Sequence, residues 1–313
     1  MKRIVQEVRD FSRVFYDENK SRLSSIYLVG SLARSRPQDN IKSTDVDICL
    51  VSKSYYDLFI KSRFEKFMAS KIPSPEINAG VYPVWRLTSG LDKSHHMYDL
   101  KNNSMILAGE DLRPLIPEIT IEDFYPLEGF LFILNRSIDL LRAIERVTVK
   151  GITINKELLK SAISRIKRAY LDSYLVFRKQ YCPDYDIRVQ MFTSLGNHLP
   201  NLETFEDARV LLLDGFDEGL KITKISTCGH LIDLIESRYQ YPLNFRIFTS
   251  IMTRKPRAIF HNPLLNTYKK AIRFLRVGDM KPRDWDEFKA DLIRTFNYSP
   301  QPALVKRNLR LTN

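Results

Sequence analysis

The first 120 residues alternate between helix-spaced apolar positions and short, continuous apolar runs. Apolar residues three or four apart indicate an amphipathic helix, whereas short apolar runs bounded by turn residues are typical of buried strands. In chain order the pattern predicts a helix over residues 1–23, a strand over 26–29, a short helix, a strand over 45–51, a helix over 55–70, a strand over 76–85 that ends near Pro83, and a short element from Tyr98 into 106–109. This β-α-β-α-β series is typical of an α/β domain.

Beyond Tyr125 the pattern changes to long stretches with helical spacing. The predicted helices cover residues 127–147, 156–180, 204–213, 220–239, 263–277 and 284–296. We therefore expect three parts, which are an α/β (α+β) domain with a mixed sheet over 1–120, an all-helical domain over 121–298, and a basic, flexible tail over 299–313.

Composition places the chain among soluble globular proteins. Its 313 residues suffice for two domains, and 44% hydrophobic and 27% charged residues are ordinary values. No apolar run is long enough for a membrane span, and the first residues contain no apolar signal core. The three cysteines are scattered and lack the spacing of metal ligands. These features predict a cytoplasmic protein without a membrane partner.

The net charge of +12 is concentrated at one end of the chain. Residues 1–120 carry +3, residues 121–220 carry −2, and residues 221–313 carry +11. Two interpretations follow for the basic residues between positions 254 and 310. They form either a solvated helical face with a basic tail, or a surface for a polyanion such as nucleic acid. No zinc finger or other nucleic-acid-binding motif decides between them.

Two polar features interrupt the apolar runs of the first domain. Gly30 and Ser31 follow the first strand, and after thirteen further residues Asp45 and Asp47 occur within the second. Glycine lets the backbone approach a ligand closely, and the start of the next helix presents N–H groups to an anion. Because side chains alternate along a strand, the two carboxylates project from one face, roughly 6–7 Å apart, where they can share divalent cations. This combination indicates metal-assisted phosphoryl or nucleotidyl transfer.

The combination resembles the signature of the nucleotidyltransferase superfamily typified by DNA polymerase beta. In addition, residues 103–109 resemble the Asn-Ser-x-x-Leu-x-Gly segment that closes the catalytic domain of bacterial aminoglycoside-type adenylyltransferases. Residues 179–188 resemble a turn in the helical domain of those enzymes, with Asp184 where serine is common. The resemblance implies that Asp45 and Asp47 bind two Mg²⁺ ions and that ATP is the donor.

Such enzymes also need a third acid. Glu76 opens the next predicted strand and resembles the glutamate that serves as general base in aminoglycoside adenylyltransferases. Asp99 is the alternative if the strand register differs from the expected one. The resemblance further implies that Gly30 and Ser31 position the β- and γ-phosphates. Arg34 follows this turn and could bind the triphosphate, because guanidinium groups suit phosphate oxygens.

The expected reaction is Mg²⁺-dependent transfer of AMP from ATP to a hydroxyl of a small molecule, with release of pyrophosphate. Two alternatives remain, which are nucleotidyl transfer to an RNA or protein acceptor and a non-catalytic nucleotide-binding protein. His95 and His96 are adjacent in a polar segment, so we expect their rings to point apart and to hold no metal. The sequence contains no P-loop motif, which argues against a kinase of that class.

Overall fold

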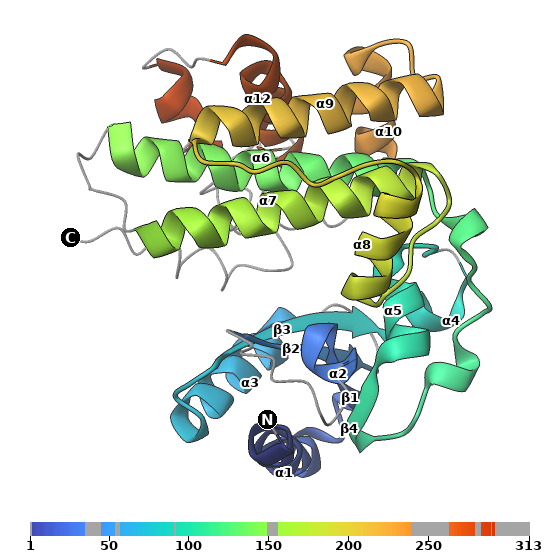
Figure 1. Cartoon of the computed structure of the whole chain (residues 1–313). Helices are drawn as coiled ribbons and strands as arrows, with labels where there is room; N and C mark the ends of the chain where they lie inside the picture. The colour runs from blue at the N-terminus through green and yellow to red at the C-terminus, as the bar shows by residue number, and fades with distance from the viewer. Residues whose placement is uncertain are drawn as a thin grey trace, which may run out of the picture. The chain divides into compact units, whose positions relative to one another are not determined.

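The computed structural model describes residues 2–34, 45–53, 57–90, 92–148, 156–238, 263–278, 283–288 and 290–291. These residues form two compact units, one ending at Phe124 and the other beginning at Tyr125 (Figure 1). The expected tail, 299–313, lies outside the described residues. No helix in the described part of the chain is long and apolar enough to cross a membrane.

The first unit combines a four-stranded sheet with helices and short 3-10 turns (Figure 1). Its elements are α1 (Lys2–Asn19), β1 (Leu23–Val29), α2 (Gly30–Arg34), β2 (Asp45–Ser52), α3 (Leu58–Lys71), β3 (Glu76–Pro83), α4 (Val84–Thr88), α5 (His95–Asn103), β4 (Met105–Gly109), η1 (Arg113–Leu115) and η2 (Ile121–Asp123). The predicted strands and long helices are confirmed. The expected strand over 76–85 ends at Pro83, and the two residues after it begin α4.

The strands lie in the order β3-β2-β1-β4. β1 is antiparallel to both β2 and β4, whereas β2 is parallel to β3. The mixed sheet predicted from the sequence is therefore confirmed. Because β2 and β3 run in the same direction, their first residues meet at the same end of the sheet.

One face of the sheet lies in the hydrophobic core of this unit. Val46, Ile48 and Leu50 alternate along β2 and are almost fully buried in a cluster with residues of α1 and α3. In that cluster Phe15 and Phe64 meet edge to face, with ring centroids 5.1 Å apart. Burial of these alternating side chains fixes the register of β2, since a slip of one residue would expose them all.

The intervening residues of β2 face the opposite side of the sheet. Cys49 pairs in register with Tyr27, and both are buried there. The hydroxyl of Tyr27 accepts the N–H of Leu112 at 2.6 Å, so the segment after β4 covers this part of the face. By strand alternation Asp47 lies on the same face as Cys49.

The second unit is helical, as predicted (Figure 1). Its elements are α6 (Leu127–Thr148), α7 (Lys156–Phe177), α8 (Tyr185–Ser194), α9 (Phe205–Thr223), α10 (Cys228–Arg238) and α12 (Pro263–Val277), with further helical residues at 283–288 and 290–291. Apolar residues of α6, α7, α9, α10 and α12 share one core.

Two helix boundaries differ from the sequence-based prediction. Two separate helices were expected over residues 204–213 and 220–239. Instead α9 continues to Thr223, and the residue that caps its end, Lys224, has the left-handed backbone conformation. Gly215 and Gly219 lie within α9 and do not end it. Because they carry no side chain, α7 can pack closely against α9 at these positions. A Cβ on Gly215 would lie 2.9 Å from the Tyr170 ring, and one on Gly219 would lie 2.4 Å from Phe177.

Candidate active site

The turn between β1 and α2 brings the backbone of Gly30 against the carboxylate of Asp47. Gly30 has φ of 72°, a conformation that favours glycine, and it begins the five-residue helix α2. A Cβ added to Gly30 would lie 2.5 Å from Asp47 Oδ2 and 3.2 Å from Asp47 Cβ. Both the backbone conformation and the close approach therefore require glycine at this position.

Asp47 is held in place by its neighbours along β2. Val46 and Ile48 anchor the strand in the core, and the backbone of Asp47 pairs with Val29, the last residue of β1. Asp47 itself is partly exposed. The sheet thus places this carboxylate directly beside the Gly30–Ser31 turn, as the two sequence motifs led us to expect.

The backbone register brings the other acidic positions to the same end of the sheet. Asp45 pairs with Glu76 across the parallel strands, and Asp47 pairs with Asn78. Neighbouring strands lie about 4.8 Å apart, so these four positions form one compact group. The side chains of Asp45 and Glu76 lie outside the described atoms, as does that of Arg34 at the end of α2.

Asn78 is the residue of this group that the sequence analysis did not single out. It is partly exposed and next to Asp47 in register. The available signal was its spacing of two from Glu76, which places both residues on one face of the strand. An amide at this position can donate or accept a hydrogen bond.

The other candidates lie on α5 rather than on the sheet. Asp99 is partly exposed in the middle of this helix. His95 and His96 occupy its first turn, after Ser94, whose hydroxyl accepts the N–H of Met97. The expectation that the two histidine rings point apart is wrong, because their centroids lie 3.8 Å apart. No group of three His, Cys, Asp or Glu side chains that could hold a metal is found within the described part of the chain.

Cys49, two residues beyond Asp47, is a buried thiol. Burial raises its pKa to about 12, against a smaller opposing effect of the positive charge of Arg86. Arg86 lies over the ring of Tyr82, 4.7 Å from the centroid, and forms an ion pair with Asp92. Cys49 therefore stays protonated at neutral pH and serves as a core residue, as expected from its place in a strand.

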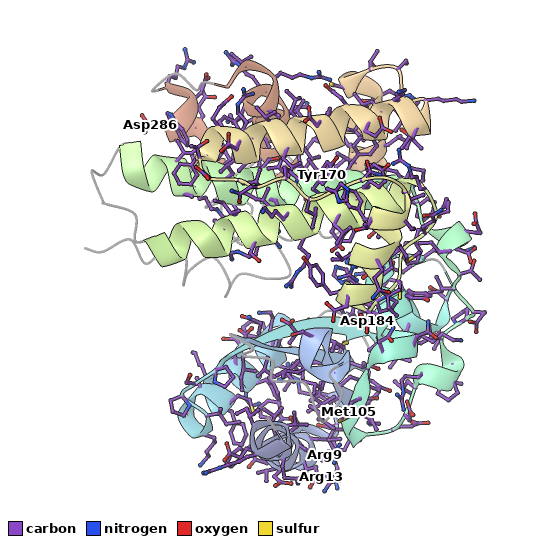
Figure 2. The ribbon with its side chains drawn as sticks, viewed as in Figure 1. Arg9, Arg13, Met105, Tyr170, Asp184 and Asp286 are labelled. Carbon is purple, nitrogen blue, oxygen red and sulfur yellow. The ribbon has the colours of Figure 1, made fainter. Side chains whose placement is uncertain are left out.

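The segment that resembles a turn of aminoglycoside-type enzymes has a structural explanation of its own. Asp184 caps α8 by accepting the N–H groups of Asp186 and Ile187 (Figure 2). Serine and aspartate are both good residues for this capping position. Arg188 is buried, lies 2.8 Å from Asp172, and donates to the carbonyl oxygen of Cys182 at 2.7 Å.

The basic last third is only partly described, and its described cations on α12 are largely neutralised. Lys270 pairs with Asp291 at 2.5 Å, and Arg276 pairs with Asp217 at 2.6 Å. Arg273 lies 3.4 Å from Asp284. The remaining basic clusters of the sequence, at 254–257 and 306–310, lie outside the described residues.

Comparison with solved structures gives a weak structural similarity. No protein-family model matches the chain, and no curated protein matches it. A crystal structure of spectinomycin adenyltransferase AAD(9) from Enterococcus faecialis with ATP and spectinomycin aligns with a TM-score of 0.37 and 12% sequence identity. The alignment covers 71% of this chain and 99% of that chain. Similarity at this level does not establish a common activity.

Proposed function

We propose that this protein is an Mg²⁺-dependent nucleotidyltransferase that transfers AMP from ATP to a hydroxyl of a small molecule and releases pyrophosphate. The observation that carries the proposal is the close approach of Gly30 to the Asp47 carboxylate. It joins a turn suited to phosphate and an acid suited to a metal at one end of the sheet. The register that sets Asp45 beside Glu76 adds two further acidic positions there.

The residues present fit a magnesium site. Carboxylate oxygens are the ligands that Mg²⁺ prefers, and the absence of a side chain at Gly30 lets Asp47 Oδ2 lie directly against the turn. Asp45 and Asp47 would hold two ions. When bound, such ions neutralise negative charge on the triphosphate and on the attacking and leaving oxygens.

The remaining roles fall to residues around this pair. Backbone N–H groups at the start of α2 and the Ser31 hydroxyl would orient the β- and γ-phosphates, and Arg34 would bind the triphosphate. Glu76 is favoured over Asp99 as general base, because Glu76 pairs with Asp45 in the sheet whereas Asp99 lies on a helix. It would accept the proton of the acceptor hydroxyl as the new bond to phosphorus forms.

A small-molecule acceptor is favoured over RNA by the pairing of cations on α12. Lys270, Arg273 and Arg276 each have a carboxylate partner, so they present little net charge to a polyanion. An RNA or protein acceptor would have to bind elsewhere. A non-catalytic nucleotide-binding role is disfavoured by the presence of Asp45, Asp47 and Glu76 at adjacent register positions.

The experiment is to incubate the pure chain with each nucleoside triphosphate, labelled in turn on its α-phosphate, together with Mg²⁺ and a cell extract. Fractionation of the extract into small molecules, RNA and protein then identifies the acceptor class. We expect label from ATP in the small-molecule fraction. Label in the RNA fraction, with binding that weakens steeply as salt rises, would replace the small-molecule acceptor by nucleic acid.

A further inference from the structure

The two edges of the sheet in the first unit differ. At β3, the side chain of Glu65 on α3 accepts the N–H of Ala79 at 3.1 Å, so a helix protects that edge. At β4, the described residues show no backbone–backbone hydrogen bond beyond the pairing with β1. A strand with an unoccupied edge is a template on which another strand can add.

A surface groove of about 590 Å³ runs beside β4. It is lined by Arg13, Tyr16 and Asp17 of α1 and by residues 106–109. Arg9 donates to the sulfur of Met105 at 3.0 Å, and a Cβ on Gly109 would lie 2.8 Å from the Tyr16 ring. The helix therefore runs alongside the whole strand, and Figure 2 shows Arg9, Arg13 and Met105 close together on this side of the unit.

The two charges in the groove have opposite signs. Arg13 and Asp17 lie one helical turn apart and are exposed, and neither forms an ion pair with the other or with another described residue. The groove thus presents a cation and an anion beside an unoccupied strand edge.

We propose that this edge is the contact between two copies of the chain. β4 would pair antiparallel with β4 of a second copy about a two-fold axis, and Arg13 of each copy would pair with Asp17 of the other. A two-fold contact exchanges the residues of the two copies, so a surface carrying both charges one turn apart is complementary to itself. An acidic peptide would satisfy only Arg13 and would meet like charge at Asp17. Self-association satisfies both residues and extends the sheet.

The test is the mass of the full chain in solution, measured by sedimentation equilibrium over a range of micromolar concentrations. We expect a dimer for the parent. Arg13→Glu and Asp17→Lys should each weaken the dimer by about tenfold or more, because each replaces two attractions with two repulsions. The double variant, Arg13→Glu with Asp17→Lys, should restore it, because the pairs re-form with the charges exchanged.

Arg3→Glu is the matched control, since Arg3 is on the same helix, its side chain is 92% exposed, and it does not line the groove. It should leave the dimer unchanged. In parallel, hydrogen exchange of the backbone amides at 105–109 should slow as the parent associates. A parent that stays monomeric, a dimer that tolerates both single reversals, or a double variant no better than the singles would overturn the proposal.

Discussion

Gly30 and Asp47 share a space that holds only one side chain. The carboxylate of Asp47 occupies the position that a Cβ on Gly30 would enter, at 2.5 Å from Oδ2. The two residues come from different strands and are brought together because Val29 pairs with Asp47 in the antiparallel ladder. The turn that we propose for phosphate and the acid that we propose for metal are therefore one structural unit, and a change in either should alter the other.

Replacing Gly30 with alanine should displace the Asp47 carboxylate and lower the rate of transfer by about 100-fold, because small displacements of catalytic groups cost this much. The left-handed backbone adds a destabilisation of about 1–2 kcal/mol. Steady-state kinetics and chemical denaturation measure the two effects. Gly196→Ala is the control, since Gly196 has φ of 78° but no atom within 4 Å of an added Cβ. It should lose stability without losing activity, and equal activity in both variants would contradict the account.

Glu76→Gln should separate nucleotide binding from chemistry. A general base contributes about 10²–10⁴ in rate, so turnover should fall by that factor while the affinity for ATP changes little. Single-turnover kinetics and calorimetric titration with ATP measure the two quantities. Asp99→Asn is the matched comparison and should retain activity. If the Asp99 variant is the impaired one, the general base lies on α5.

Removing the guanidinium of Arg188 should destabilise the helical unit. Arg188 and Asp172 are both buried and lie 2.8 Å apart, so Arg188→Met removes the guanidinium that faces a buried carboxylate. Such a loss typically costs about 3–5 kcal/mol. Urea denaturation should show this cost, whereas the double variant with Asp172→Leu should recover part of it. A single variant as stable as the parent would show that the pair contributes nothing.

Asp123 should titrate well below an ordinary aspartate. Its carboxylate accepts hydrogen bonds from Lys93 at 2.7 Å and from the N–H of Thr120 at 2.9 Å, which lower its pKa from 3.8 to about 2. Because the folded-state pKa is depressed, the stabilisation is complete above pH 3.8 and is lost as the pH falls toward 2. NMR titration of the Asp123 carboxyl measures this pKa. Lys93→Met should raise it, and an unchanged pKa in that variant would exclude the contact with Lys93 as the main cause.

The sequence predicted those features that depend on local pattern. The apolar runs around Asp47 are short and bounded by turns, so strand positions, the face of each side chain and the place of the Gly30 turn followed directly. Features that depend on tertiary packing did not follow. The predicted helix over 204–213 ends before Gly215, yet α9 continues through this glycine, against which Tyr170 of α7 packs.

The contact between the rings of His95 and His96 is another feature without a local signal. The adjacency of the two histidines in a polar segment suggested that the rings diverge. Rotation about the side-chain bonds brings their centroids to 3.8 Å. The start of α8 could have been recognised, since aspartate at position 184 is a favourable capping residue at the start of a helix.

The most direct test of nucleotidyl transfer compares ATP labelled on the α-phosphate with ATP labelled on the γ-phosphate, using the parent and Asp47→Asn. The parent should move only the α-label to the acceptor fraction and release pyrophosphate. EDTA should abolish the transfer, and so should Asp47→Asn, although its circular dichroism spectrum should match that of the parent. Movement of the γ-label, or full activity of Asp47→Asn, would contradict the proposed reaction.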